Sequence, residues 1–406
     1  MSTSLLYHAF GFKTYKYIST KYRNGIIYFH VKKKDDARYC TKCKSRDFVL
    51  FGPVERRWNH VPIGLKPIII VGHLHILKCK KCGATCLENL DIAEARKSYT
   101  NVLVNYVLSL AKDMTLKAIS DKLTIGWDTV KTIVKEDMKS RLKHRKFNKI
   151  RIIAIDEVAV RKGHRYLTNV VDLETGVVVY STEGRDSDCL KDFFKKIKRC
   201  KKPMLEAVAL DMSPAYLKAV RLYAPKGIKI IHDRYHLVAK MNDVIDKVRR
   251  SEYQNKTDQE KAVIKGSRYL LLSASEKIAK DEDKHSRLQA LLALNETIHK
   301  SYLLKEDLRL FWKQGSRETA RLFIETWLNN ARSVGNKYLN EFSDTIEKHS
   351  EGILNYYDHP ITTGPLEGIN NKIKVLKRIA YGYRDMEFFK LRILFIRNTK
   401  FMLTGA

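Results

Sequence analysis

The sequence lacks an apolar run long enough to span a membrane, lacks a signal peptide, and is poor in acidic residues relative to basic ones. Its 406 residues include 45 Asp and Glu against 77 Lys and Arg, a formal net charge of +32. Such an excess points to a polyanionic partner, either nucleic acid or an anionic membrane. The missing membrane segment favours nucleic acid, and the length predicts two to four domains.

Cysteine is also scarce, with seven residues in the chain, and their arrangement suits metal binding in a reducing cytoplasm better than disulfides. Two Cys-x-x-Cys pairs stand out. Their members are Cys40, Cys43, Cys79 and Cys82. Gly83 suits the tight turn of a zinc knuckle, and strands are expected over 61–77. We expect one structural Zn²⁺ in a zinc-ribbon-like domain over 1–97, because four thiolates leave no open position for chemistry. The alternatives are four unrelated cysteines, or Cys86 in place of one ligand.

Residues 98–148 have the apolar spacing of short helices. These are expected over 101–112, 115–123 and 129–142, with a turn at 124–126 and Asp128 capping the last helix. The pattern is that of a helix-turn-helix, whose second helix enters the DNA major groove, although generic helical hairpins share it. Six Lys or Arg among residues 139–149 favour DNA binding. The side chains expected near the DNA are those of Trp127, Thr129, Lys131, Thr132 and Lys135.

The next region, residues 149–240, begins with an apolar stretch over 149–162 that predicts a buried strand carrying Asp156. The further strands are expected over 165–172, 177–183, 206–210 and 228–231, and the helices between them over 186–200 and 214–223. The order β-β-β-α-β-α-β-α is that of the RNase H-like fold, in which Asp156 and Asp211 lie side by side. Two close carboxylates repel unless a cation sits between them, so Mg²⁺ binding is expected. The alternative is helix capping by a strand-end aspartate such as Asp211, which precedes Ser213 and Pro214.

From 241 to 345 the pattern is helical, and we interpret this region as an insertion into the core, which resumes over 346–406. Trp312 and Trp327 in the insertion could stack on bases or pack in its interior. After Gly364 a helix begins on which an acid, two amides and a base share one face. These residues are Glu367, Asn370, Asn371 and Lys374, and Lys377 and Arg378 extend the face. The alternative is an ordinary solvated helix face.

These parts together resemble a DDE transposase of the ISL-three group of bacterial insertion sequences, over nearly the whole chain. The Cys₄ finger and the helix-turn-helix belong to the resemblance. Its other motifs are Ile155-Asp156-Glu157, Leu210-Asp211-Met212-Ser213, His232-Asp233-Arg234-Tyr235-His236-Leu237, Leu366-Glu367-Gly368-Ile369-Asn370-Asn371-Lys372-Ile373-Lys374, Lys377-Arg378 and Ala380-Tyr381-Gly382-Tyr383.

The resemblance implies a multidomain α/β protein with an RNase H-like catalytic core and a triad of acids. The triad is Asp156, Asp211 and Glu367. Two Mg²⁺ ions about 4 Å apart, or Mn²⁺ in their place, would be held by these carboxylates. His236 and Lys374 are further catalytic candidates, and Lys377 and Arg378 are candidates for DNA binding.

The expected function is cleavage of DNA at the terminal inverted repeats of an insertion sequence and joining of these ends to target DNA. The partner is double-stranded DNA, the enzyme is expected to act as a homodimer by analogy, and the expected location is the bacterial cytoplasm, at the nucleoid. The alternative is a transposase-derived DNA-binding regulator without catalysis. An RNase H-like nuclease without transposition leaves the two N-terminal DNA-binding modules unexplained.

Overall fold

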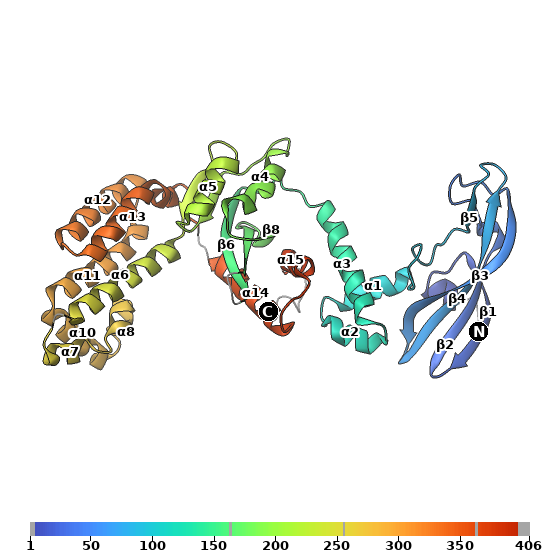
Figure 1. The fold of residues 1–406 in the computed structure, drawn as a ribbon, viewed down its shortest axis with the longest axis horizontal. Coiled ribbons are helices and arrows are strands. Elements are labelled where there is room, and N and C mark those ends of the chain that lie inside the picture. The colour runs from blue at the N-terminus through green and yellow to red at the C-terminus, as the bar shows by residue number, and fades with distance from the viewer. Residues whose placement is uncertain (1–4, 162–164, 255, 362–363, 397–406) are drawn as a thin grey trace. The chain divides into compact units, whose positions relative to one another are not determined.

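The computed structural model describes residues 5–161, 165–254, 256–361 and 364–396, so residue 162, the end of the first predicted core strand, lies outside the described part. The chain divides into two compact units (Figure 1). One contains residues 1–145 and 395–406, and the other contains residues 146–394.

The N-terminal unit begins with a sheet in the order β1-β2-β4-β3, with β5 added to β4. Its strands are β1 (Tyr15–Arg23), β2 (Ile26–Lys33), β3 (Phe48–Ile63), β4 (Lys66–Cys79) and β5 (Thr85–Leu87). The long β3–β4 hairpin turns at Gly64, whose φ of +58° is a left-handed conformation that glycine adopts without strain. Trp58 of β3 is fully buried and packs with apolar residues of β2 and β4.

Three helices follow in the same unit. They are α1 (Asn101–Leu110), α2 (Leu116–Leu123) and α3 (Trp127–Lys143). The hydroxyl groups of Thr100 and Thr115 accept hydrogen bonds from backbone N–H groups and cap α1 and α2. The predicted start of α3 was wrong by two residues. Gly126 is its N-cap, and Asp128 lies inside the first turn, where the helix dipole stabilises a carboxylate.

The second unit contains a five-stranded sheet in the order β10-β9-β6-β7-β8. Its strands are β6 (Ile152–Arg161), β7 (Arg165–Asp172), β8 (Val177–Glu183), β9 (Ala207–Leu210) and β10 (Lys229–His232). β6, β7 and β8 are antiparallel, whereas β9 pairs in parallel with β6 and with β10. The helices that connect or follow these strands are α4 (Lys191–Lys198), α5 (Pro214–Tyr223), α14 (Gly364–Ile379) and α15 (Met386–Leu394).

The sheet is covered on both faces (Figure 1). Ile153 and Ile155 of β6 pack with Phe193 of α4 and Leu217 of α5 in one buried cluster. α14 packs against β6, and α15 packs against β8. Because side chains alternate between the faces of a strand, the even-numbered residues of β6 lie on the face opposite α4 and α5.

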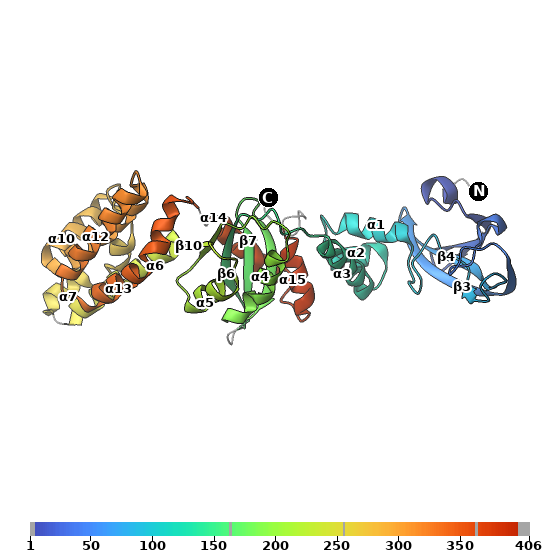
Figure 2. The ribbon, with the colours of Figure 1, turned by 90° about the horizontal axis from the view of Figure 1, so that it is seen from above.

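Between β10 and α14 the chain forms a helical bundle (Figure 2). Its helices are α6 (Arg234–Gln254), α7 (Asp258–Ile264), α8 (Arg268–Leu272), α9 (Ser275–Ile278), α10 (Glu282–Leu294), α11 (Glu296–Leu310), α12 (Arg317–Ser333) and α13 (Lys337–Leu354). Trp312 and Trp327 lie in the apolar interior of this bundle, and the indole N–H of Trp327 donates to the Leu304 carbonyl at 2.8 Å. They therefore pack in the core, which was the second of the two alternatives for them. Across the described ranges, no helix has the length and apolar character that crossing a membrane requires.

Candidate active site and metal centre

Two acids lie on the same face of the sheet, at its centre. Ile153 and Ile155 face α4 and α5, so Asp156 faces the other side, toward α14. On the neighbouring strand β9, Val208 and Leu210 belong to the same buried cluster as Ile153. Asp211 directly follows Leu210 and, with the strand alternation continued, shares the face of Asp156.

The strand register brings these two acids level with one another. β6 and β9 pair in parallel, with Ile153 opposite Val208 and Ala154 opposite Ala209. When this register is continued for two more residues along each strand, Asp156 comes to lie opposite Asp211, which directly follows β9. Neighbouring strands are about 4.8 Å apart, so the two carboxylates start from adjacent backbone positions.

The Asp156 carboxylate is mostly buried and held by two hydrogen bonds. The Glu157 N–H donates to Oδ1 at 2.7 Å, and the Asn370 amide donates to Oδ2 at 2.5 Å. Burial raises the pKa of Asp156 above its ordinary value, and the nearby Asp211 charge raises it further. The Glu157 N–H, His236 and the Asn370 amide act in the opposite direction. The site therefore disfavours an uncompensated negative charge on Asp156, and a bound cation would compensate it.

Helix α14 is attached to β6 at two points. Asn370 contacts Asp156, and two turns later Lys377 donates from Nζ to the Val160 carbonyl at 3.1 Å. The helix and the strand therefore run in the same direction. Glu367 lies one turn before Asn370 on the same helix face.

The structure does not gather the three acids as closely as a bound ion would. Glu367 and Lys374 are exposed. Among the described residues, the ligand atoms of Asp156, Asp211 and Glu367 do not converge as those of the four cysteines do. The Oδ1 atom of Asn370 is buried and without a hydrogen-bond partner in the described part of the chain. An orphaned oxygen beside two carboxylates fits a cation, whose coordination or hydration shell would satisfy it.

His236 lies at the start of α6, close enough to the acids to affect the pKa of Asp156. Its Nε2 atom is 3.7 Å from an Asp233 carboxylate oxygen. Asp233 is buried, and its other oxygen accepts a hydrogen bond from the Tyr235 N–H at 2.8 Å. Both residues follow the carboxyl end of β10, which pairs with β9 at the edge of the sheet.

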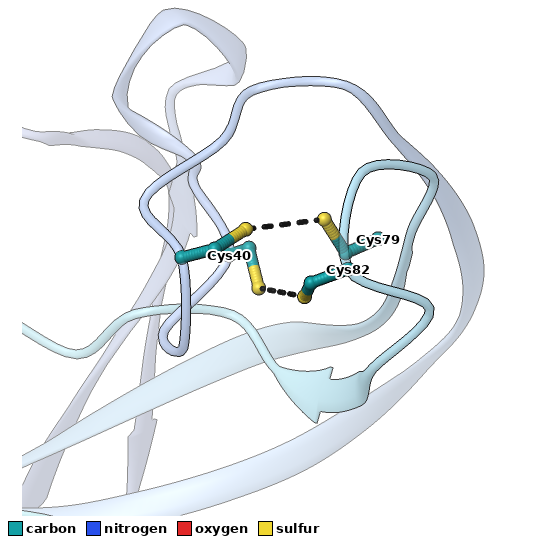
Figure 3. A group of neighbouring side chains, drawn as sticks. Cys40, Cys79 and Cys82 are labelled. Carbon is teal, nitrogen blue, oxygen red and sulfur yellow. Dashed lines mark hydrogen bonds between the residues drawn. The ribbon is translucent and has the colours of Figure 1, made fainter.

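The four cysteines form a separate cluster in the N-terminal unit. Their sulfur atoms lie within 4.8 Å of one another, and Figure 3 shows Cys40, Cys79 and Cys82 pointing toward one another. The S···S distance is 3.8 Å from Cys40 to Cys82 and 3.5 Å from Cys43 to Cys79. A tetrahedral zinc with Zn–S bonds of about 2.3 Å requires S···S distances of about 3.8 Å, so the thiols fit this ion. Within the described residues, this is the only group of three or more His, Cys, Asp or Glu that converges in this way.

Backbone N–H groups favour the thiolate form of two of the four cysteines, Cys40 and Cys79. The Cys43 N–H lowers the pKa of Cys40 to about 6, because it donates toward the sulfur and favours the thiolate. The Cys82 N–H lowers the pKa of Cys79 in the same way. Gly83 has a φ of +68°, which allows the second turn to close. Cys86 lies outside the cluster, so the structure does not support its exchange for one of the four ligands.

Helix α3 carries the side chains expected to read DNA. Trp127 is 43% exposed, and the ammonium group of Lys131 lies 5.3 Å from the centre of its ring. Lys135 is one turn further along, and Thr129 lies beside the N-cap at Gly126. The other face of α3 packs against the rest of the domain, and its buried residues are Val130, Ile133, Val134 and Met138.

Comparison with known proteins identifies the family. Residues 153–393, more than half of the chain, match a model for the DDE transposases of ISL3, described as Transposase. Residues 88–137 match the helix-turn-helix domain of transposase family ISL3. The chain belongs to the ISL3 family of transposases.

Two relatives illustrate the extent of the similarity. The transposase for insertion sequence element IS1001 of Bordetella parapertussis is 33% identical over 358 residues, which cover 87% of each chain. The transposase for insertion sequence element IS1557 of Mycobacterium tuberculosis is 26% identical over 376 residues, which cover 86% of this chain and 83% of the relative. The present chain is thus an insertion-sequence transposase with a DNA-binding helix-turn-helix, and its family implies a divalent metal.

Two contacts of this transposase were not foreseen from the sequence. Asn370 shared a predicted helix face with Glu367, but its hydrogen bond to Asp156 joins residues 214 positions apart. The only sign of this contact in the sequence was the residue type, because an uncharged amide on a helix face with charged residues can donate to a buried carboxylate. Lys377 was expected to bind DNA, but its ammonium group donates to backbone carbonyls of β6. Arg378 is exposed on the same helix and is therefore the more accessible of the two cations.

Proposed function

We propose that this transposase is a DDE enzyme with an RNase H-like core over 149–240 and 346–406, interrupted by a helical insertion over 241–345. It cleaves DNA at the ends of its insertion sequence and joins them to target DNA. The observation that carries the proposal is the sheet order β10-β9-β6-β7-β8 with Asp156 and Asp211 level on one face. The contact of Asn370 with Asp156 supports Glu367 as the third acid, because it holds α14 on that face.

The residues proposed to hold two Mg²⁺ ions are Asp156, Asp211 and Glu367. When bound, the ions would supply activation of water or of a DNA 3′-hydroxyl and would stabilise the leaving oxygen. Asn370 orients the Asp156 carboxylate. His236 handles a proton at the edge of the site, and Lys374, two turns beyond Glu367, positions a DNA phosphate.

The N-terminal unit is proposed to recognise the transposon ends. A zinc ion held by the four cysteines keeps the finger of residues 1–97 folded, and the helix-turn-helix of 98–148 places α3 in the major groove. Trp127, Lys131 and Lys135 contact the DNA there. Two copies of the chain are proposed to pair the two ends as a homodimer, which follows from the symmetry of an element with two ends.

The alternative of a regulator without catalysis differs in a measurable way. Glu367→Gln keeps the size of the side chain but removes a charge from the metal site, so Mg²⁺-dependent nicking of a DNA end should fall by orders of magnitude while binding survives. Glu351→Gln is the matched control, because Glu351 is exposed and pairs with Arg317 on α12. Lys374→Ala should cost about 10- to 1000-fold in nicking, through the loss of one charge-assisted contact and some misalignment.

The outcomes separate the alternatives. Normal nicking by Glu367→Gln together with a dead Glu351→Gln would refute the third carboxylate but not the fold. A wild-type protein that binds the ends and never nicks them with Mg²⁺ or Mn²⁺ would establish the regulator.

A further inference from the structure

A cavity of about 320 Å³ lies between α5 of the sheet domain and α13 of the helical bundle. Its apolar lining includes Met212, Leu217 and Leu222. Met212 directly follows the candidate metal ligand Asp211 in the sequence, and the remaining lining residues belong to α5 and α13. Leu222 is 56% exposed, so part of this wall is open to solvent.

The rim of the cavity is positively charged. Lys218 and Arg221 of α5 and Lys348 of α13 line it, and all three are exposed. None of them has an ion pair with any described residue, and no described Asp or Glu is among the lining residues. Burial lowers the pKa of His349, which also lines the cavity, and the charges of Lys348, Lys240 and Arg221 lower it further. Three converging cations without a counter-ion favour an anionic ligand.

An apolar wall and a cationic rim fit the two parts of a nucleotide. The face of a base gains from contact with apolar side chains, whereas its phosphate gains from Lys and Arg. The volume lies at the lower end of the range for small-ligand sites, about 300–1000 Å³, which suits one nucleotide and excludes a duplex. An inorganic anion would use the rim and leave the apolar wall without a function.

We infer that this cavity binds a single unstacked nucleotide of the DNA on which this transposase acts. The inference rests on the proposed function, because it takes DNA as the ligand. A base inside a duplex is stacked on both sides and cannot enter, so the nucleotide must be unpaired or rotated out of the helix. With the strand alternation continued, the side chains of Met212 and Asp211 point to opposite faces of the sheet. The cavity therefore holds a nucleotide that has left the duplex, on the α5 side of the sheet.

The test uses the full-length protein and a five-residue thymidine oligonucleotide that carries one 5-iododeoxyuridine, followed by ultraviolet crosslinking and peptide mapping. The wild type should crosslink to peptides from 212–222 and 348–349. The double variant Arg221→Ala/Lys348→Ala should lower this crosslink at least about tenfold. The logarithmic salt dependence of its yield should become shallower by about 1.4, since each single-strand phosphate contact contributes about 0.7. Lys226→Ala is the control, because Lys226 is exposed in the turn after α5 and does not line the cavity.

Each outcome decides the inference. Crosslinks that map only to residues 1–145, or a double variant that behaves like Lys226→Ala, would overturn it. Full competition by inorganic phosphate without competition by thymidine would show a plain anion site and would also overturn it. Asp211→Asn separates this inference from the proposed function, since it should abolish Mg²⁺-dependent nicking and leave the cavity crosslink unchanged.

Discussion

Replacing Asn370 with alanine tests the contact on which the geometry of the active site depends. The amide of Asn370 donates to Oδ2 of Asp156 at 2.5 Å, and Asn370 is only 9% exposed. Alanine removes this donor and leaves the α14 backbone in place, because alanine is the best helix former. Asn371→Ala is the matched control, since Asn371 is the next residue of the same helix and is exposed.

The expected magnitude follows from the charge on the acceptor. A hydrogen bond to a charged group contributes about 1.5–3 kcal/mol, which corresponds to about 10- to 150-fold in an equilibrium constant. The pKa of Asp156 is already raised by burial, and loss of the amide raises it further, because the amide favours the ionised form. Protons compete with Mg²⁺ for this carboxylate. Asn370→Ala should therefore require more Mg²⁺, and its nicking activity should be lost at a higher pH than that of the wild type as the pH falls.

The assay is nicking of a DNA end as a function of Mg²⁺ concentration at several pH values, with thermal unfolding measured in parallel. The Mg²⁺ requirement of Asn370→Ala should rise by about 10-fold or more, and the rise should grow toward low pH. Asn371→Ala should follow the wild-type curves. A lower Mg²⁺ requirement in Asn370→Ala would mean that the amide competes with the ion for the Asp156 oxygen. That result would refute the argument, as would identical curves for the two variants.

Two further perturbations, each with a control, test the cysteine cluster of the N-terminal unit and the contact of α13 with His232. Cys40→Ser should remove the zinc, which is expected at about one ion per chain in the wild type, and should unfold the N-terminal finger. The control Cys86→Ser should keep both the zinc and the folded finger. Metal analysis measures the zinc, and limited proteolysis measures the folding. In Gly352→Ala the new Cβ would lie 2.5 Å from the His232 ring, so the free energy of unfolding should fall by about 1–3 kcal/mol. Gly368→Ala meets no atom within 4 Å and should raise stability by about 0.5–1 kcal/mol in the same denaturation experiment.

Sequence reasoning succeeded where local chemistry sets the boundaries of an element. The strand over 165–172, the strand over 177–183 and the helix over 214–223 have the predicted bounds. Gly176 adopts a φ of +64° in the turn between the two strands, and Pro214 occupies the first turn of the helix. Such residues act within a few positions of themselves, so the sequence alone reveals them.

Contacts between distant segments were beyond the same reasoning. The N-terminal sheet places β2 in parallel beside β4, with Ile27 opposite Ile68, and no local pattern specifies that pairing. The start of α3 was missed because Gly126 caps it without a side chain. The places of Asp156 and Asp211 in the sheet could be predicted, because one lies within a strand and the other directly after one. The contact of Asp156 with Asn370 could not, because it depends on how α14 docks.

The helical bundle contributes to this docking, because its last turns are clamped to the edge strand β10. The Asn355 amide donates to the Ile230 carbonyl at 2.9 Å, and Lys229 pairs with Asp358 at 2.7 Å. These contacts surround the close approach of α13 to His232, where no side chain larger than that of glycine fits at residue 352. The chain therefore leaves the bundle at a fixed place beside the sheet, six residues before α14 begins. A helix that starts there and attaches through Asn370 can present Glu367 to the face of Asp156 although 155 residues of sequence separate it from Asp211. Bundle and sheet belong to one compact unit, and the proposed third acid, Glu367, therefore depends for its placement on the exit of the chain from the bundle.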